Sequence, residues 1–385
     1  MSQATKNFGL SEEQLLMQES LSKLLEKVLP SDLALRLDEA REFPHDAYQA
    51  LAEAGYMGLL YPVEDGGLGA SLEDFAFFIE TVAYHNTQLA SAYLTTVLYG
   101  GRHLQVAAQP ELKKELLPHV IDGSGKMAFC LTEADTGSDA ASIVTRAKSD
   151  GDDFVIHGTK MFITCAHVAD HLIVVTKTDP DAGHRGITMF VVDADAPGVT
   201  INPMKTVGRR TIHTNIVSFD NVRVPATRML GTLNNGWGQL MFGLNLERIA
   251  LSASAVGNMQ RIVDYASAYA RERVQFGKPI ASYQAVSHKL VDMQIMTDAG
   301  RGLLYRATSL LDADEDCSSA SAITKIFTTE HNVLCADMGI QVMGGAGYSM
   351  EHLMQMFWRD SRVGPIGGGT NEILRNVVGK RMGLS

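Results

Sequence analysis

This 385-residue sequence has no cysteine clusters, no long apolar runs and no excess of positive charge. Its four cysteines (Cys130, Cys165, Cys317 and Cys335) are far apart and form no C-x-x-C pair, which argues against a disulfide framework and a thiolate zinc site. A formal charge of −11 offers no basic face for nucleic acid. No apolar run reaches the roughly 20 residues that a membrane-spanning helix needs. We therefore expect no metal site, no nucleic acid partner and no membrane span.

Nucleotide-binding and targeting signatures are missing as well. There is no G-x-G-x-x-G fingerprint, and Gly123-Ser-Gly-Lys126 lacks the first glycine and the Ser/Thr of a P-loop. Residues 1–6 have neither the apolar core of a signal peptide nor an Arg/Ser-rich transit pattern, so we expect a cytoplasmic protein of bacterial type. A chain of this length and 45% hydrophobic content is long enough for two or three compact units.

The hydrophobic pattern of the sequence changes twice, from helical to strand-like and back to helical. Ser11-Glu-Glu-Gln14 forms a capping box, and helical spacing continues to about residue 124. Short β-branched runs separated by Asp-Gly, Pro-Asp and Ala-Pro-Gly turns then predict a small antiparallel sheet. Long amphipathic patterns return after residue 235 and indicate a helical bundle. We predict an α+β fold with an N-terminal helical domain (1–124), a middle β domain (125–235) and a C-terminal helical domain (236–385).

Two segments of the middle third could hold a ligand. Phe129–Asp139 joins a short strand to a polar turn whose hydroxyl and N–H groups suit an anionic or amide-rich ligand. Taken alone, the segment is better explained as an Asx or Ser/Thr turn between strands. Lys160–Thr164 is an alternating strand in which Phe162 could face a ligand or the core. Further along, Arg273–Gly277 places a guanidinium suited to phosphate beside an aromatic ring. The alternative for Arg273 is a charge that stabilises a helix C-terminus.

Glu247 interrupts an apolar helical stripe. Five residues follow one another at helical spacing: Leu240, Leu244, Glu247, Leu251 and Ser254. A carboxylate in such a stripe is partly buried, and burial raises its pKa toward the range useful to a general base. The structural alternative is an ion pair with Arg248 or Arg273. We predict that Glu247 is a catalytic base.

The tail of the chain contains two glycine-rich segments, Met343–Ser349 and Phe357–Ile373, the second with an Arg-Asp pair. It closely resembles the C-terminal region of the acyl-CoA dehydrogenases, flavoenzymes that desaturate acyl thioesters. The resemblance extends back through Arg273–Gly277 and Leu131–Asp139 to Phe8–Gln14, and so covers essentially the whole chain. It implies a C-terminal four-helix bundle, noncovalently bound FAD, an acyl-CoA substrate, an electron-transferring flavoprotein as partner, and a homotetramer built as a dimer of dimers.

The same resemblance assigns roles to individual residues. The flavin ring would contact Leu131, Thr132, Phe162, Thr164 and Thr370. The pyrophosphate and adenosine would be bound by Ser138, Arg273, Gln275, Phe276, Gln341, Gly344 and Gly345, with Arg273 reaching across a subunit interface. The acyl-CoA would contact Ser138, Leu244, Arg248, Gly367 and Gly368.

One departure from the family pattern matters for catalysis. The usual catalytic glutamate, one residue before the Gly-Thr dipeptide, is here Gly368. Isovaleryl- and long-chain-type members carry the base on the helix that corresponds to Glu247. By the same resemblance, Gly368 would still donate its N–H to the thioester carbonyl, and Gly367-Gly368 would widen the pocket for a branched or bulky acyl group. A tight turn that needs φ > 0 is the simpler account of these glycines.

The resemblance leaves three functions open. The first is oxidation of an acyl-CoA to the trans-2-enoyl-CoA, with electrons passed to the partner flavoprotein. The second is the reverse reaction, as in crotonobetainyl-CoA reductases, whose glycine-rich C-terminal loops look similar. The third is a catalytically silent flavin- or CoA-binding relative, which would be favoured if Glu247 did not face the flavin.

Overall fold

The computed structural model describes residues 10–384. Phe8 and Gly9 of the opening motif, and the residues considered for targeting, lie outside this range. The capping box is confirmed, since Ser11 Oγ accepts the Gln14 N–H (3.1 Å) and Gln14 Oε1 accepts the Ser11 N–H (3.1 Å). The helices of the N-terminal part are α1 (Glu12–Val28), α2 (Ser31–Ala40), α3 (His45–Glu53), α4 (Leu72–His85), α5 (Thr87–Leu94), α6 (Arg102–Ala107) and α7 (Pro110–Ile121). A π-helical stretch, Thr95–Gly101, joins α5 to α6.

The middle of the chain forms a mixed sheet. Its strands are β1 (Met127–Cys130), β2 (Arg146–Asp150), β3 (Asp153–Thr164), β4 (His171–Lys177), β5 (Ile187–Asp193), β6 (Val199–Met204), β7 (Thr214–Pro225) and β8 (Met229–Leu230). They follow the order β6-β7-β3-β2-β4-β5-β8, and β1 pairs with β4. Most pairings are antiparallel, as predicted. The exceptions involve β4, which pairs in parallel with β1 (Met127 opposite His171) and with β2 (Arg146 opposite Lys177). The long connection between β1 and β4, which contains β2 and β3, makes a parallel pairing possible.

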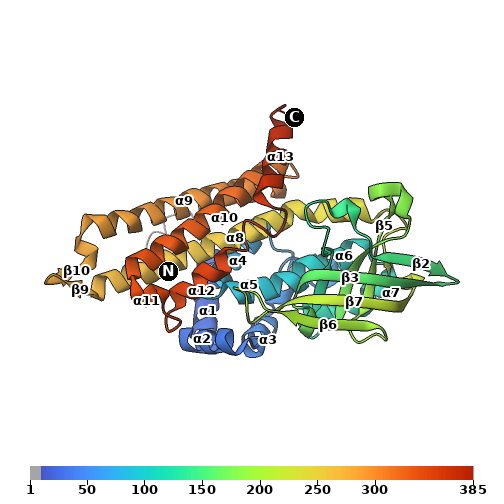
Figure 1. The fold of residues 1–385 in the computed structure, drawn as a ribbon, viewed down its shortest axis with the longest axis horizontal. Helices are drawn as coiled ribbons and strands as arrows, with labels where there is room; N and C mark the ends of the chain where they lie inside the picture. Colours follow the sequence, from blue (N-terminus) through green and yellow to red (C-terminus); the bar gives the residue numbers. More distant parts are fainter. Residues whose placement is uncertain (1–9, 385) are drawn as a thin grey trace.

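Helices again dominate the last part of the chain. The elements are α8 (Gly236–Glu272), β9 (Val274–Gln275), β10 (Lys278–Pro279), α9 (Gln284–Asp312), α10 (Ser318–Met343), α11 (Gly345–Tyr348), α12 (Leu353–Ser361) and α13 (Asn371–Arg381). The long helices α8, α9 and α10 pack on one another, and α13 packs on α10. With 37 residues, α8 is about 55 Å long at 1.5 Å per residue. Figure 1 shows the sheet near one end of this helix and the β9–β10 hairpin at the other.

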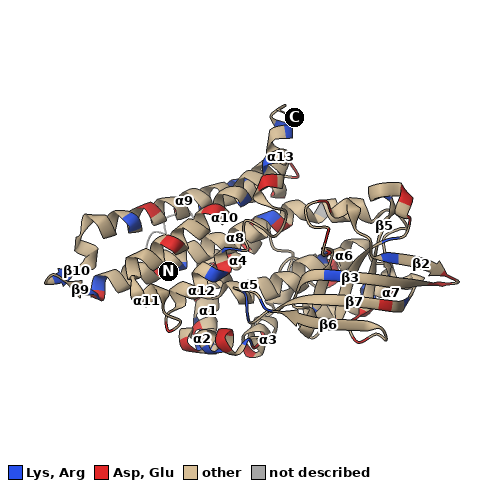
Figure 2. Cartoon of the chain, viewed as in Figure 1, with Lys and Arg blue, Asp and Glu red and all other residues tan. Residues whose placement is uncertain are grey.

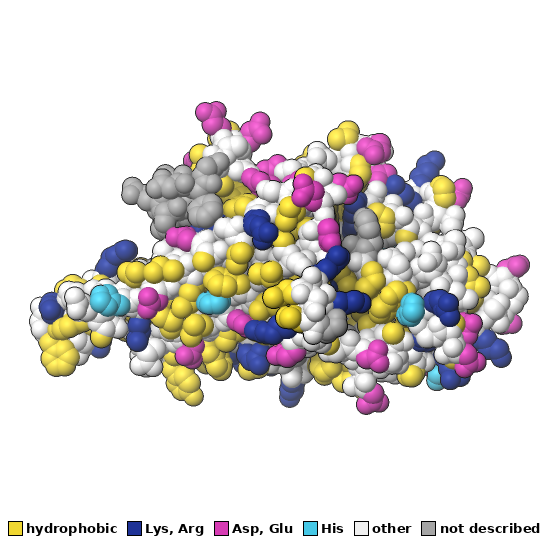
Figure 3. Space-filling model, turned by 90° about the horizontal axis from the view of Figure 1, so that it is seen from above, with side chains coloured by type: hydrophobic (Ala, Val, Ile, Leu, Met, Phe, Trp, Pro, Cys, Tyr) yellow, Lys and Arg dark blue, Asp and Glu magenta, His cyan; other side chains and the backbone are white. Residues whose placement is uncertain are grey.

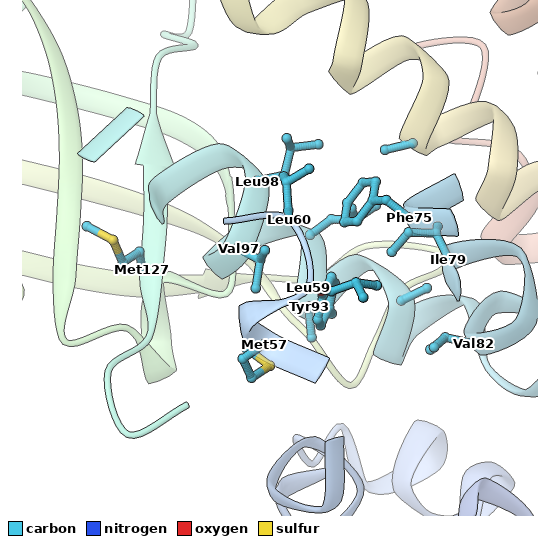
Figure 4. Packing of buried hydrophobic residues seen from close by; sticks show 14 of the residues in the cluster. Met57, Leu59, Leu60, Phe75, Ile79, Val82, Tyr93, Val97, Leu98 and Met127 are labelled. Atoms are coloured by element: carbon cyan, nitrogen blue, oxygen red, sulfur yellow. The ribbon is translucent and has the colours of Figure 1, made fainter. Parts of the chain in front are cut away.

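The helical and sheet parts share a core. Figure 4 shows Met127 of β1 beside Val97 and Leu98 of the π-helical stretch, with Phe75 and Ile79 of α4 further along the same cluster. Helices α4 and α8 also pack closely, because a Cβ at Gly257 would lie 2.1 Å from the Glu80 carbonyl oxygen. This close packing fixes α8, and with it Glu247, relative to the sheet.

Charged side chains are scattered over the fold. Figure 2 shows Lys and Arg interspersed with Asp and Glu along the helices and strands. Among residues 10–384, none of the helices combines the length and the hydrophobicity needed to cross a bilayer.

Candidate active site

Glu247 lies on α8, half-buried, with no ion pair to any residue in the described part of the chain. Burial raises its pKa to about 7, although the charges of Arg248 and Lys325 oppose this shift. Arg248 donates instead to Asn245 Oδ1 (3.0 Å). The salt-bridge alternative is therefore not what the structure shows. A carboxyl group with a pKa near 7 can take up or release a proton at neutral pH.

Gly368 lies directly against Glu247. Its φ is +65°, and a Cβ at this position would lie 3.3 Å from Glu247 Oε1 and 2.4 Å from Leu251 Cδ1. The loop and the helix thus bring the family's two base positions to one place. The space beside Gly368 is taken up by Glu247 and Leu251, so no extra pocket volume arises there. Gly367 is more open, since its Cβ would lie 3.7 Å from the nearest atom, the Val363 carbonyl oxygen.

The N–H of Gly368 has no hydrogen-bond acceptor among residues 10–384. It is therefore free to donate to a ligand oxygen next to Glu247. Leu244 and Arg248 flank Glu247 on the same helix, and the Arg248 side chain is almost fully buried. The structure thus brings together Glu247, Gly368, Gly367, Leu244 and Arg248.

Lys325 is a residue of this site that the sequence analysis missed. Its fully buried ammonium group, on α10, donates to the Gly369 carbonyl oxygen (2.8 Å) and to Asn371 Oδ1 (2.9 Å). Burial lowers its pKa to about 8. Lys325 thus anchors the glycine loop and places a positive charge near Glu247. The available signal was a lone lysine on the buried face of α10, next to Ala322 and Thr329.

The two candidate segments of the middle part are bound to each other. Leu131 and Thr132 follow β1; Lys160 Nζ donates to the Leu131 carbonyl oxygen (2.9 Å), and the Met161 N–H donates to the Thr132 carbonyl oxygen (2.8 Å). Lys160 also forms a buried ion pair with Glu133 (2.8 Å). Neither member of this pair was predicted as functional. Their contact holds the polar turn in place beside β3.

Phe162 points out of the fold. Its side chain is 55% exposed and its φ is +61°, at an irregularity in the pairing of β3 with β7. The interpretation of Phe162 as a core residue is therefore wrong. Thr164 ends β3, and Ser138 is exposed in the polar turn. The hydroxyls of Thr132 and Ser138 have no partner within residues 10–384. An exposed flat ring and free hydroxyls are thus available on this solvent-accessible part of the sheet.

Arg273, Gln275 and Phe276 lie elsewhere, in the exposed β9–β10 hairpin. Phe276 is 94% exposed with φ +51°, and the Arg273 guanidinium has no partner in the described range. Glu247 and Arg273 are about 39 Å apart along α8 at 1.5 Å per residue. Figure 1 shows the hairpin at the end of the molecule opposite the sheet. One chain therefore does not bring the predicted phosphate-binding residues to the predicted flavin-binding residues.

The other residues predicted for the cofactor are divided between two places. Gln341 is exposed near the end of α10, and Gly344 (φ +60°) and Gly345 are exposed where α10 gives way to α11. Thr370 caps α13 by accepting the Ile373 N–H (3.3 Å), at the end of the glycine loop. Thr370 thus lies two residues after Gly368, in the loop that contacts Glu247.

Known protein families match this chain in three consecutive parts. The N-terminal, middle and C-terminal domain models of acyl-CoA dehydrogenases match residues 11–124, 128–222 and 234–383. The chain belongs to the acyl-CoA dehydrogenase family. Probable acyl-CoA dehydrogenase YngJ of Bacillus subtilis is 34% identical over 378 residues, which cover 98% of this chain and 99% of the relative.

Two further relatives show the range of this acyl-CoA dehydrogenase family. The caffeyl-CoA reductase-Etf complex subunit CarC of Acetobacterium woodii is 32% identical over 372 residues, 96% of this chain and 97% of that protein. A crystal structure of an FAD-dependent dehydrogenase is 30% identical with a TM-score of 0.89, covering 98% of this chain and 100% of that one. The present acyl-CoA dehydrogenase family member is an oxidoreductase with FAD as its cofactor.

The residues of the sheet fit a flavin. The exposed Phe162 ring offers a flat apolar surface, and the hydroxyls of Thr132 and Ser138 are free to bind polar atoms. The Arg-Asp pair of the family motif has a different task. Arg359 forms an ion pair with Asp38 (2.5 Å), and Asp360 Oδ1 accepts the Arg209 N–H (2.6 Å). This pair anchors α12 to the N-terminal helices and to the segment before β7.

Proposed function

We propose that this protein oxidises an acyl-CoA thioester to the trans-2-enoyl-CoA, with Glu247 as the base. The observation that carries the proposal is a half-buried carboxyl group of raised pKa beside a free backbone N–H, that of Gly368. An α proton next to a thioester becomes acidic when the carbonyl oxygen accepts a hydrogen bond. A base and a carbonyl-binding N–H are the two groups that this chemistry requires.

In the proposed reaction, the Glu247 carboxylate takes the α proton of the substrate. The N–H of Gly368 donates to the thioester oxygen and stabilises the negative charge that develops there. A bound FAD would supply the hydride acceptor for the β carbon, so that the substrate would lose one proton and one hydride and gain a double bond. Leu244, Arg248, Gly367 and Ser138 would contact the acyl-CoA.

We propose that a second copy of the chain completes the cofactor site. Leu131, Thr132, Phe162, Thr164 and Thr370 would hold the flavin ring. The residues at the far end of α8 and α10 would bind the phosphates and adenosine of a neighbouring subunit's cofactor: Arg273, Gln275, Phe276, Gln341, Gly344 and Gly345. Exposed apolar residues of α9, such as Val291 (53%) and Ile295 (61%), suit a subunit contact. Figure 3, which views the molecule from above, shows hydrophobic side chains over its helical half. A homotetramer built as a dimer of dimers would provide such contacts.

A second candidate function is the reverse reaction, reduction of an enoyl-CoA. One relative is named as a reductase subunit of an Etf complex. A pKa of about 7 leaves Glu247 partly protonated at neutral pH, so that it can also deliver a proton to the α carbon. In either direction, we propose an electron-transferring flavoprotein as the redox partner. We also propose a cytoplasmic location, consistent with four buried, unpaired cysteines.

Anaerobic mixing of the purified FAD-loaded protein with a panel of acyl-CoAs tests the proposal. Bleaching of the flavin absorbance by at least one saturated thioester is the expected result. The reverse mixing, photoreduced protein with the matching enoyl-CoAs, measures the reductive direction. If no thioester changes the flavin redox state in either direction, the chain is a catalytically silent relative and the proposed function is wrong.

A further inference from the structure

Two histidine rings are stacked where the N-terminal helices meet the sheet. His167 lies in the turn between β3 and β4, and His213 directly precedes β7. Their ring centroids are 4.2 Å apart, with 27° between the ring planes. The ring of Phe43, from the loop between α2 and α3, contacts His167 edge-on, with 6.2 Å between the centroids. The stack thus joins three segments that are far apart in the sequence.

The main chain holds both rings in place. His213 Nε2 lies 2.6 Å from the Arg41 carbonyl oxygen. A carbonyl oxygen only accepts, so this nitrogen carries a hydrogen and donates it. The Cys165 N–H donates to the carbonyl oxygens of Ile212 and His213 (3.1 and 3.2 Å). Cys165 and His213 have φ values of +59° and +39°, a region in which residues other than glycine are uncommon. The backbone thus fixes the two rings against each other in a strained arrangement.

His167 has no acceptor for a second ring proton. Both of its ring nitrogens are enclosed and have no hydrogen-bond partner among residues 10–384. A neutral imidazole carries one N–H, whereas an imidazolium carries two and needs an acceptor for each. Burial, together with the charges of His213 and His45, lowers the pKa of His167 to about 4. The packed arrangement therefore accommodates His167 only in its neutral form.

No carboxylate in the described chain is placed to neutralise a positive charge on the stack. Within residues 10–384, the histidines at ion-pair distance from a carboxylate are His157 and His171. Asp170, the nearest carboxylate in sequence to His167, accepts the Lys126 N–H (2.7 Å). The carboxylates on the segments around the stack are exposed or already bound, and they are Asp38, Glu42, Asp46, Asp170 and Asp220.

The remaining ionisable groups near the stack are basic or uncharged. Strand β6, which packs against this turn, has no charged residue. The thiol of Cys165 stays protonated at neutral pH, because burial raises its pKa to about 12, and burial also raises the pKa of the Tyr48 phenol. The basic groups are Arg41, His45, Lys126 and Arg209. A proton taken up by the stack therefore meets no compensating negative charge among the described residues.

We propose that the stack of His167 and His213 makes the junction between the N-terminal helices and the sheet acid-sensitive, and that its opening at acidic pH releases FAD. One proton is tolerated, because a charged His213 faces a neutral ring and keeps its hydrogen bond to the main chain. A second proton places two like charges 4.2 Å apart. Separating the rings moves Cys165 and His213, which adjoin the paired residues Thr164 and Thr214. The link to FAD rests on the proposed contact of Thr164 with the flavin ring, whereas the acid sensitivity of the junction does not.

The direction of the effect follows from the linkage between proton binding and folding. An unfolded chain binds the proton at the ordinary histidine pKa of about 6.5, whereas the folded chain resists it down to about 4. Lowering the pH through this range therefore favours the opened and unfolded states. We expect two quantities to fall between about pH 6.5 and pH 4. They are the unfolding temperature of the FAD-loaded wild type and its FAD-to-protein ratio after gel filtration.

Two variants remove the charge from the stack in different ways. His167→Phe keeps a ring in place, and its unfolding temperature should fall several degrees less than that of the wild type over the same pH range. FAD should also be retained at lower pH. His213→Gln keeps a donor for the Arg41 carbonyl oxygen and should give the same protection, which guards against a folding defect of one variant. His157→Phe, at an exposed position of β3, is the matched control and should follow the wild type.

Parallel pH curves for the wild type, His167→Phe and His213→Gln would overturn the proposal. Equal retention of FAD by the wild type and both variants, despite different unfolding temperatures, would overturn the release of the cofactor. No acyl-CoA enters these measurements, so they decide this proposal whether or not any thioester reduces the flavin.

Discussion

The two ends of α8 are equipped differently. Near its N-terminal end, Glu247 is surrounded by groups of its own chain, including Gly368 of the loop and Lys325 of α10. At its C-terminal end, the Arg273 guanidinium has no partner in the described chain, and Phe276 is 94% exposed and contacts only the edge-on ring of Tyr283 among the described residues (centroids 6.4 Å apart). A single chain therefore brings together the residues of the proposed proton-transfer site, whereas the residues predicted to bind phosphate lie at the far end of the helix and would serve a cofactor held elsewhere. Changes at one end should affect chemistry, and changes at the other should affect cofactor retention and assembly.

The largest effect is expected from Glu247→Gln. Removal of a general base costs roughly 10² to 10⁴ in rate, while the nearly isosteric amide preserves folding, yellow colour and acyl-CoA binding. Stopped-flow measurement of the rate at which substrate reduces the flavin tests this loss. Glu272→Gln, an exposed residue at the other end of the same helix, is the control and should behave as the wild type. Full activity in Glu247→Gln would mean that another residue is the base.

A double variant tests whether helix and loop address the same proton. Glu247→Gly/Gly368→Glu should recover part of the activity that Glu247→Gly loses, because the two positions are in contact. Recovery should stay incomplete, since a glutamate is strained at φ +65° and Leu251 must move aside. Equal rates in the single and double variants would show that the loop position does not reach the α proton.

Arg273→Ala tests the opposite end of α8. Loss of a charge-assisted phosphate contact should weaken FAD binding by about 1.5 to 3 kcal/mol without changing the pH dependence of flavin reduction in the FAD-loaded fraction. The FAD-to-protein ratio after gel filtration measures cofactor retention, and the mass from light scattering measures the oligomeric state. Arg271→Ala, on the same last turn of α8, is the matched control. Unchanged FAD content and oligomeric state would contradict the intersubunit role.

A smaller effect is expected at the pocket wall. The prediction from Gly367-Gly368 is that branched acyl chains are accepted at least as well as linear ones of equal carbon number. Leu251 fills the space beside Gly368, so Leu251→Ala should shift kcat/KM toward the branched thioester, by about tenfold, within the 1 to 3 kcal/mol typical of such discrimination. Paired steady-state assays decide this. A strong preference for short unbranched chains in both proteins would refute it.

The smallest effect should come from Lys325→Met. The positive charge of Lys325 lowers the pKa of Glu247, so its removal should raise that pKa above about 7. The deprotonated base then needs a higher pH, and flavin reduction should slow several-fold at pH 7 and recover at alkaline pH. The control is Thr329→Val, which removes the hydrogen bond from Asn371 Nδ2 to Thr329 Oγ1 (3.1 Å) without changing a charge. It should leave unchanged the pH at which flavin reduction reaches half of its maximal rate. If the wild type, Lys325→Met and Thr329→Val had the same midpoint in the pH dependence of flavin reduction, an electrostatic role for Lys325 would be excluded.

Local patterns in the sequence predicted a large part of this structure. The capping box at Ser11 and the helix–sheet–helix order follow from short-range periodicity and turn residues. The half-buried position of Glu247 follows from its helical spacing. The domain boundaries at 124/125 and 235/236 and the individual cofactor contacts stay predictions.

Contacts between distant segments were not predictable in the same way. The parallel pairing of β1 with β4, the Lys160–Glu133 ion pair and the position of Lys325 beside Glu247 depend on how remote elements pack. Periodicity reports which face of an element is buried, but not which residue of another element lies against it. Local patterns can also mislead. The Arg359-Asp360 pair indicated part of a site, but in this structure it anchors α12 to other segments.

The contact between Gly368 and Glu247 also limits the order in which such a base could have moved during evolution. A chain that gained a loop glutamate before it lost the helix glutamate would hold two carboxylates within a few ångströms of each other. Such a pair shares one proton, and one of its two pKa values is strongly raised. An intermediate of this kind would titrate as a unit and work poorly as a base at neutral pH. A glycine at position 368 avoids this conflict, and its N–H is free to donate to the carbonyl oxygen of the proposed substrate.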